Sequence, residues 1–302
     1  MLFELQYLKR DQLRKLLATF LLLGVGAFLF AQNQSQHYRI RTYSREQGLD
    51  QSQVREILQD SRGYLWMAMQ GGGVSRFDGL RFKNYRKDQG LLSNDVGAMC
   101  LDKLGNLWFA CDKAGLSCYN GSKFTTLDKQ QGIEFENSKA LFCSADNQIW
   151  LGTEGEGIFI WDGKKTRRIQ QSDGLPSDSV LSFFTKDAQT VWVGTSRGIF
   201  EVKNGKASAL DSLQYPNAPQ SSVEMIIRRK DGSIVGCDLR RGLWHLGSTG
   251  FVYDSLPVEM GVLNALMEDD EQQLWVGGSL AVACIGPKGT RIFGTEDGLK
   301  EV

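Results

Sequence analysis

Net charge is absent from this chain, and its absence narrows the range of partners. The 302 residues include 35 lysines and arginines and 35 aspartates and glutamates, so the formal net charge at pH 7 is zero. A protein dedicated to nucleic-acid binding needs a positive field that attracts phosphates. The composition therefore argues against a nucleic-acid partner.

Histidine is also scarce. The chain has two, His37 and His245, and neither stands at ligand spacing from a cysteine or from the other. A Ser-His-Asp arrangement lacks a suitable base among them. We therefore expect no metal site, no cofactor and no catalytic residues, and we expect the protein not to be an enzyme.

Closely spaced cysteine pairs are lacking as well. No CxxC pair occurs, and the six cysteines occupy strand positions that other parts of the chain give to Ala, Thr, Ser or Met. Buried thiols behave as small apolar side chains. We expect free thiols rather than disulfides or metal ligands at Cys100, Cys111, Cys118, Cys143, Cys237 and Cys284.

Tryptophan provides the strongest positive signal, because it recurs at a fixed interval. The recurring slot holds Trp66, Trp108, Trp150 and Trp192 at intervals of 42 residues, then Val235 and Trp275. A period of about 40 to 45 residues is typical of a four-stranded propeller blade. The sequence therefore predicts a repeat architecture built from blades.

The residues around each tryptophan predict four strands per repeat. A turn residue stands three positions earlier, as at Gly63 and Gly105, and a glycine follows six or seven positions later, as at Gly73. Then come the dipeptides Asp78-Gly79, Asn120-Gly121, Asp162-Gly163 and Asn204-Gly205. Such dipeptides favour type I′ hairpin turns, in which both central residues have positive φ.

The fold expected from this pattern is all-β. We predict a β-propeller of four-stranded blades, with six full blades plus an N-terminal strand of an incomplete seventh. A lone four-stranded sheet cannot bury both faces, so we expect the repeated tryptophans to form the core between blades. The tryptophans predicted to be core are Trp66, Trp108, Trp150, Trp192 and Trp275. The sequence leaves undecided whether Trp161 and Trp244 are buried.

Residues 1–31 are predicted to be separate from the propeller at 37–302. Four basic residues between Lys9 and Lys15 precede an apolar stretch from Leu16 to Ala31. This layout is that of a secretory signal peptide, and the stretch is short for a permanent anchor. An uncleaved N-terminal anchor is the alternative, and both place the propeller in the periplasm or otherwise outside the cytoplasm.

The two ends of the repeat array predict an open ring. His37 to Tyr43 have the pattern of a fourth strand without the three that precede it in a blade, and Gly298-Leu299 form an exit turn just before the last residue, Val302. We expect the propeller to be C-terminally incomplete, as in a fragment, or to be completed by a partner that supplies strands. An open arc has exposed sheet edges, which favour association.

The repeats resemble those of the two-component regulator propeller family, the periplasmic sensor region of propeller-type histidine kinases and hybrid systems. The residues that carry this resemblance are Gly90–Val96, Asp102–Trp108, Gly174–Val180, Trp150–Thr153, Trp192–Thr195 and Arg76–Gly79. Val235 departs from the pattern, as does Gly277-Gly278-Ser279, which runs into Leu280 without the usual glycine. The resemblance implies a sensor whose kinase activity belongs to downstream modules that the family carries after its propellers.

The loops between strands are the expected place for a ligand, since loops on a rigid scaffold commonly carry recognition. In a propeller the fourth-to-first and second-to-third strand connections lie on one face. That face is predicted to present Asp50, Gln51, Gln70, Asn94, Asp95, Lys113, Glu154, Glu156, Asp178, Arg197, Arg240 and Arg241. This mixture suits a polar ligand such as an oligosaccharide, and it suits a protein surface equally.

Three functions therefore remain open at the level of sequence. The first is the extracytoplasmic, ligand-binding sensor of a two-component receptor, and the second is a protein–protein interaction scaffold. The third is an enzyme acting on polysaccharide, for which Glu154 and Glu156 would be the paired carboxylates.

Overall fold

The computed structural model describes residues 40–256 and 260–299. The predicted signal peptide at 1–31 and the start of the predicted N-terminal strand at His37 lie outside these residues. Within them, none of the helices has the length and apolar character needed to cross a membrane. The residues after Arg41 form one compact unit.

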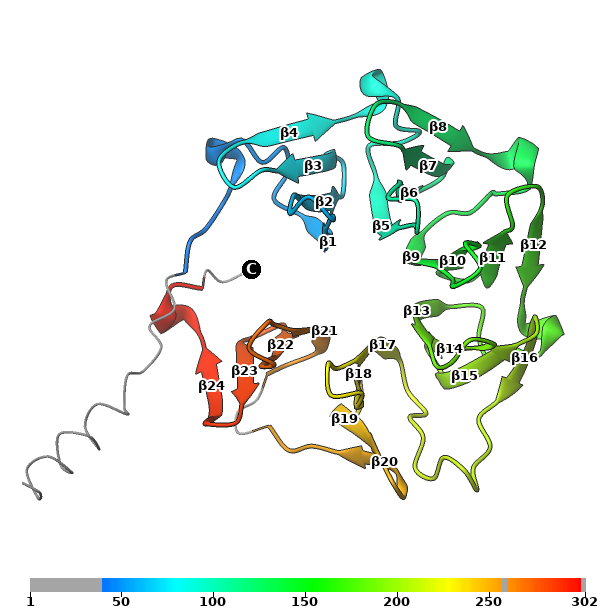
Figure 1. Cartoon of the computed structure of the whole chain (residues 1–302), viewed down its shortest axis with the longest axis vertical. Helices are drawn as coiled ribbons and strands as arrows, with labels where there is room; N and C mark the ends of the chain where they lie inside the picture. The colour runs from blue at the N-terminus through cyan, green and yellow to red at the C-terminus, as the bar shows by residue number, and fades with distance from the viewer. Residues whose placement is uncertain (1–39, 257–259, 300–302) are drawn as a thin grey trace, which may run out of the picture. The chain divides into compact units, whose positions relative to one another are not determined.

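That unit is a ring of six four-stranded antiparallel sheets, which confirms the predicted all-β propeller (Figure 1). Blade 1 comprises β1 (Val54–Gln59), β2 (Leu65–Met69), β3 (Gly73–Phe77) and β4 (Phe82–Tyr85). Blade 2 comprises β5 (Val96–Leu101), β6 (Leu107–Cys111), β7 (Gly115–Tyr119) and β8 (Phe124–Leu127). Blade 3 comprises β9 (Ser138–Cys143), β10 (Ile149–Thr153), β11 (Ile158–Trp161) and β12 (Thr166–Ile169).

The other three blades repeat this order. Blade 4 comprises β13 (Val180–Thr185), β14 (Thr190–Thr195), β15 (Gly198–Lys203) and β16 (Lys206–Ala209). Blade 5 comprises β17 (Val223–Arg228), β18 (Ile234–Asp238), β19 (Gly242–Gly247) and β20 (Gly250–Tyr253). Blade 6 comprises β21 (Leu263–Glu268), β22 (Leu274–Gly278), β23 (Val282–Gly286) and β24 (Gly289–Phe293). The first strand of each blade lies nearest the centre of the ring (Figure 1).

Short 3-10 helices follow the outer strands β4, β8, β12 and β24, and another precedes blade 1. They are η2 (Arg45–Gln47), η3 (Lys87–Gln89), η4 (Lys129–Gln131), η5 (Gln171–Asp173) and η6 (Thr295–Asp297). Each ends at a left-handed glycine, such as Gly90 with φ 110°. This conformation is favourable only without a Cβ, so the recurrent Gly-Leu and Gly-Ile signals mark these exits.

One prediction about the turns is wrong at three of the four dipeptides. Only Asn204-Gly205 has positive φ at both residues; at Asp78-Gly79, Asn120-Gly121 and Asp162-Gly163 the glycine alone does. The reason is visible in blade 1, where the Asp78 carboxylate accepts hydrogen bonds from the backbone N–H of Leu80 and Arg81. The side chain thus caps a four-residue loop, and the aspartate keeps a negative φ.

Apolar side chains fill the interfaces between consecutive blades. In the first interface Trp66 packs with Tyr85 from blade 1 and with Met99, Phe109 and Tyr119 from blade 2. Trp66, Trp150 and Trp192 are buried as predicted, whereas Trp108 and Trp275 are half-buried. Of the two tryptophans whose burial was left undecided, Trp244 is buried and Trp161 is half-buried.

An aspartate six residues before the tryptophan explains part of the repeat. The indole N–H donates to Asp60 from Trp66 (2.9 Å), to Asp102 from Trp108 (3.1 Å) and to Asp269 from Trp275 (2.8 Å). The other oxygen of each carboxylate accepts backbone N–H groups of the turn between the first and second strands. One side chain therefore ties the tryptophan to its turn.

Blades 3 and 4 lack this aspartate. Ser144 and Lys186 occupy its position, and the buried indole nitrogens of Trp150 and Trp192 have no hydrogen-bond partner among the described residues. The Ser144 hydroxyl accepts from the Gln148 backbone N–H at 2.9 Å and so holds the turn. Its side chain is shorter than an aspartate, and the indole N–H is left unsatisfied.

The ring has an opening between blades 6 and 1 (Figure 1). Inner strands of consecutive blades contact one another from β1 through to β21, but β21 and β1 do not do so to a comparable extent. Ile57, on β1, is 60% exposed, whereas Met99 at the same register position of blade 2 is 1% exposed. Met267, on β21, is 57% exposed, against 6% for Phe184 at the same position of blade 4.

The predicted N-terminal strand at 37–43 lies partly outside the described residues, and residues 40–44 have irregular backbone. Tyr43 contacts Phe77 (5.0 Å between ring centroids) and Phe82 (5.8 Å). Tyr85, at the end of β4, makes the same contacts with Tyr119 and Phe124 of the next blade. Tyr43 therefore takes the place of an outer strand's last residue against blade 1.

Restoring the aspartate in blade 3 should stabilise the propeller. We expect Ser144→Asp to raise the free energy of unfolding by about 1 kcal/mol, because the new carboxylate reaches the orphan indole N–H of Trp150. Denaturant unfolding measures the change. In a Trp150→Phe background the gain should disappear; an undiminished gain there would show that it comes from the turn and not from the indole.

Candidate functional site

The predicted loop face exists. In each blade a backbone hydrogen bond joins the loop after the second strand to the loop before the first strand. In blades 1 to 3 these bonds run from Gln70 N–H to Gln53 O (3.1 Å), from Asp112 N–H to Asp95 O (2.9 Å) and from Glu154 N–H to Asn137 O (3.0 Å). The two kinds of loop therefore lie on one side of the ring. The residues proposed for recognition divide into three groups by what they contact there.

The residues of the first group hold the loops in place through an ion pair and hydrogen bonds. The Asp50 carboxylate pairs with the Arg86 guanidinium, with 2.6 Å from Nη2 to Oδ1. The Asn94 side-chain oxygen accepts from the Lys87 backbone N–H at 3.0 Å, and the Asp178 carboxylate accepts from the Gln171 backbone N–H at 2.8 Å. These residues position exit turns.

The second group surrounds the loops of blades 2 and 3. Glu154 pairs with Lys139 (3.1 Å), and the exposed Lys113 lies 3.9 Å from Glu136. Glu156 accepts from the Glu136 backbone N–H at 3.2 Å. The carboxylates of Glu154 and Glu156 thus have different partners and do not act as a pair.

The third group is exposed on other blades. Gln70, Arg197, Arg240 and Arg241 are exposed, and Gln51 is half-buried. The Arg241 guanidinium lies 3.6 Å from the centroid of the Tyr253 ring. The structure does not bring the predicted residues together in one cluster; of them, Glu154 reaches the central channel through Lys139.

The residues that do converge come from the inner strands. Every inner strand has a β-bulge directly after its first residue. A bulge bends its strand and re-aims a side chain, and bulges are common beside functional sites. The six bulged residues are Arg55, Gly97, Lys139, Leu181, Glu224 and Asn264.

These six residues line one cavity of about 350 Å³ at the centre of the ring. The bulged positions give it the guanidinium of Arg55, the ammonium of Lys139, the carboxyl group of Glu224 and the amide of Asn264, and Glu56 and Ser182 line it as well. Phe142 and Phe183 add two rings whose centroids are 5.9 Å apart. A concave site with a few polar groups among apolar walls is the usual form of a small-molecule site.

An ion pair between blades 1 and 2 holds Arg55 on the cationic side of this cavity. The Arg55 guanidinium donates to the buried Asp112 carboxylate at 2.6 Å, and Asp112 also accepts from the backbone N–H (2.9 Å) and hydroxyl (2.6 Å) of Ser138. One carboxylate therefore links blades 1, 2 and 3. Its burial with three donors fixes Arg55 at the cavity wall.

Two carboxyl groups of the cavity are shifted toward the neutral form. Burial raises the pKa of Glu56 to about 7, although its Oε2 accepts from the Met99 backbone N–H at 2.6 Å. Burial also raises the pKa of Glu224, against the opposing effect of Lys139. Desolvation penalises the charged form of a carboxyl, and functional sites commonly contain such groups.

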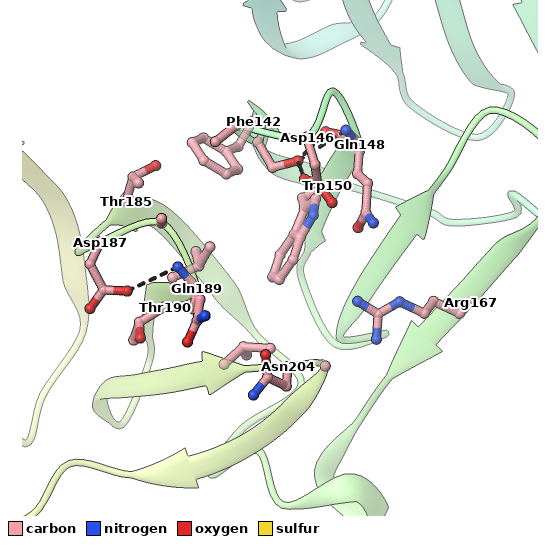
Figure 2. A pocket seen from close by; sticks show the side chains of 16 residues that line it. Phe142, Asp146, Gln148, Trp150, Arg167, Thr185, Asp187, Gln189, Thr190 and Asn204 are labelled. Carbon is pink, nitrogen blue, oxygen red and sulfur yellow. Dashed lines mark hydrogen bonds between the residues drawn. The ribbon is translucent and has the colours of Figure 1, made fainter.

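A second cavity, of about 290 Å³, lies between blades 3 and 4 (Figure 2). Trp150, Arg167, Gln189 and Asn204 are among the residues that line it, and the Arg167 guanidinium points toward the indole. Asp187 at its rim accepts from the Gln189 backbone N–H at 2.9 Å. This cavity lies beside the turn of Ser144, on the side of the ring opposite the predicted loop face.

Sequence reasoning missed the inner-strand residues of the channel. A signal was present: the inner strands of blades 1, 3 and 5 carry a charged residue at the second position, namely Arg55, Lys139 and Glu224. In an alternating strand such a residue would be placed on a sheet face. The bulge instead turns it into the channel.

Comparisons with known proteins agree with the repeat pattern. A family model described as "Two component regulator propeller" matches residues 90–113, which confirms the resemblance over one repeat. No curated protein sequence matches the chain.

Solved structures share the fold. The chain is 21% identical to the extracellular domain of a protein described as a hybrid two component system from B. thetaiotaomicron, over 88% of this chain and 36% of that one, with a TM-score of 0.67. An extracellular domain from the same organism, described as belonging to a one component system, is 15% identical over 87% and 37%, with a TM-score of 0.64. The chain thus spans about a third of the length of each of these domains.

An enzyme shares the fold too. A catalytically inactive virginiamycin B lyase from Staphylococcus aureus is 12% identical over 84% of this chain and 87% of that one, with a TM-score of 0.67. At these identities the likeness establishes the propeller fold, which supports many unrelated functions.

The shifted pKa of Glu56 should make stability depend on pH. The folded state keeps the proton up to a pH of about 7, whereas the unfolded chain loses it near 4.5, so stability falls as the pH rises between these values. Glu56→Gln keeps an acceptor for Met99 and has no charge. We expect it to match the wild type near pH 4.5 and to exceed it by up to about 3 kcal/mol at pH 8.

Denaturant unfolding across this pH range measures the difference, with the exposed Glu46→Gln as the control. A Glu56→Gln effect that does not change with pH would show that folding does not raise the pKa of Glu56.

Proposed function

We propose that this chain is the ligand-binding sensor propeller of an extracytoplasmic receptor of the two-component type. The likeness to extracellular domains of such systems supports the role, and the signal-peptide pattern at 1–31 supports export. In this proposal the propeller binds the ligand, and a kinase or other output belongs to separate modules.

The observation that carries the proposal is the bulge repeated in all six inner strands. Ring closure alone does not require the bulged positions to differ from blade to blade. They nevertheless vary from glycine and leucine to asparagine, arginine, lysine and glutamate. A β-bulge that is the same in every blade, while its side chain varies, is suited to ligand recognition in the channel.

The chemistry of the cavity favours an uncharged polar ligand with many hydroxyl groups, such as an oligosaccharide. Arg55 and Lys139 offer donors, Glu224 offers an acceptor and Asn264 offers both. The rings of Phe142 and Phe183 supply apolar surface against which the faces of a sugar ring could pack. Charges of both signs occur together, so the site does not select strongly for an anion or a cation.

Catalysis on polysaccharide is less well supported by the same geometry. Glu154 and Glu156, the carboxylates considered for it, are engaged separately by Lys139 and by the Glu136 backbone. The proposal is therefore of binding without turnover.

A second candidate function, an interaction scaffold, is favoured by the exposed Ile57 and Met267. Both flank the opening, at positions that other blades bury. We propose that the opening accepts a further blade-like sheet with an apolar inner strand, from a partner polypeptide or from another part of a longer chain. Tyr43 already occupies the position of the last residue in the outer strand of that sheet.

Binding to a panel of neutral and acidic oligosaccharides tests the sensor proposal. Thermal shift identifies a ligand and calorimetry measures its affinity. We expect Glu224→Gln and Lys139→Met each to weaken binding about tenfold, which is the value of one hydrogen bond to a charged group. Lys113→Met, on the loop face, is the matched control; loss of binding in this control with unchanged affinity in the channel variants would place the ligand on the loops instead.

A pair of truncations tests whether the opening is empty in the isolated chain. Met99→Ala should cost about 2–5 kcal/mol of unfolding free energy, because it leaves a cavity between blades. Ile57→Ala should cost less than about 1 kcal/mol, since little apolar area is lost from contact. Denaturant unfolding compares them; equal losses would mean that the opening is filled, and a loss at Ile57 that grows when a candidate partner is added would identify the occupant.

A further inference from the structure

Two cysteines on neighbouring blades are in direct contact. Cys100 lies on β5 and Cys143 on β9, and their Sγ atoms are 3.3 Å apart. Cys100 is buried and Cys143 is half-buried. No other pair of thiols is in such contact among residues 40–256 and 260–299.

The contact belongs to a regular place in the architecture. Corresponding residues of other interfaces are also neighbours: Leu58 and Leu101 pack on the first inter-blade cluster, and the Arg228 guanidinium lies 5.2 Å from the centroid of the Phe184 ring. Cys100 and Cys143 are thus held together by blade packing. Their approach does not depend on a flexible loop.

We propose that Cys100 and Cys143 form a disulfide that covalently joins blades 2 and 3 once the chain is in an oxidising compartment. The proposal rests on the extracytoplasmic location proposed above, because disulfides persist in such compartments. The sequence-based expectation of six free thiols would then hold for the reduced chain only.

The reaction is thiol–disulfide exchange with an external disulfide, such as oxidised glutathione or a disulfide-donating oxidoreductase. The thiolate of the half-buried Cys143 attacks one sulfur of that disulfide and releases the first thiol. Cys100 then attacks the Cys143 sulfur and releases the second. Two electrons pass to the external disulfide, and the two protons leave on its two thiol products.

The other cysteines are placed differently. Cys111 contacts the Ser117 hydroxyl, and Cys237 points to the Leu263 carbonyl. Cys118 is the alternative disulfide partner to exclude. Cys100 and Cys118 both pair in register with Trp108, from the strands on its two sides. Two strand spacings, about 10 Å, separate the Cys118 and Cys100 backbones, which places Cys118 further out from the ring centre.

The cross-link would also fix part of the channel. β5 and β9 contribute Gly97 and Lys139 to the cavity, and the disulfide would hold these two strands at a set separation. It would enclose the intervening 42 residues, Leu101 to Phe142, and reduce the freedom of the unfolded chain.

The test uses the full chain, purified with reductant and then exposed to oxidised glutathione at pH 8.5. The contact with Cys143 and burial raise the pKa of Cys100, so an alkaline pH hastens the second step. Thiol titration after denaturation should fall from six groups to four, the intact mass should fall by about 2 Da for two hydrogens, and peptide mapping should show a 100–143 cross-link. The melting temperature should rise, and reductant should reverse the rise.

Variants separate this pair from its rivals. Cys143→Ser should keep five thiols. Cys100→Ser should stop at the mixed disulfide of Cys143 with glutathione, which leaves four thiols and no cross-link within the chain. The control Cys118→Ser should fall from five thiols to three. Six thiols that persist in the folded protein but react after unfolding would overturn the proposal, as would a 118–143 cross-link.

Location is tested separately by trapping thiols in exporting cells before lysis. A 100–143 cross-link in the recovered chain supports both proposals. A reduced chain there, together with oxidation in vitro, would overturn the location and the disulfide in the cell while leaving the contact between the thiols intact.

Discussion

The contact between consecutive blades is the interaction on which the rest of the structure depends. A single four-stranded sheet has two faces to bury and cannot do so alone. Here each interface is filled by side chains from both blades, as Trp66 and Tyr85 of blade 1 meet Phe109 and Tyr119 of blade 2. The same dependence explains the opening, where Ile57 and Met267 lack such neighbours among residues 40–256 and 260–299 and stay exposed.

Functional features arise where one repeat departs from the others while the backbone stays the same. Arg55, Lys139 and Glu224 occupy one bulged position and give the channel its charges. Ser144 replaces an aspartate and leaves an indole N–H unsatisfied beside a cavity. Cys100 and Cys143 stand at positions where other blades carry apolar or polar residues, and they bring two thiols together. The regular repeats make these departures visible.

The fold could be predicted from the sequence because its signals are local and repeated. The tryptophan period, the turn glycines and the strand lengths each follow from the residues of one blade, and all six sheets were expected. The site could not be predicted so well. A bulge changes the direction of Arg55 without changing the strand pattern, and an aspartate such as Asp78 can cap a loop without adopting positive φ. The Cys100–Cys143 contact depends on packing between blades, which spacing along one strand does not reveal.

The most direct test of the account is a crystal structure of the propeller with the tightest-binding oligosaccharide from the panel. The account predicts ligand density in the central channel, within hydrogen-bond distance of Lys139 and Glu224 and against the ring of Phe142 or Phe183. Density confined to the loops around Arg197, Arg240 and Arg241, or to the cavity beside Trp150, would contradict it.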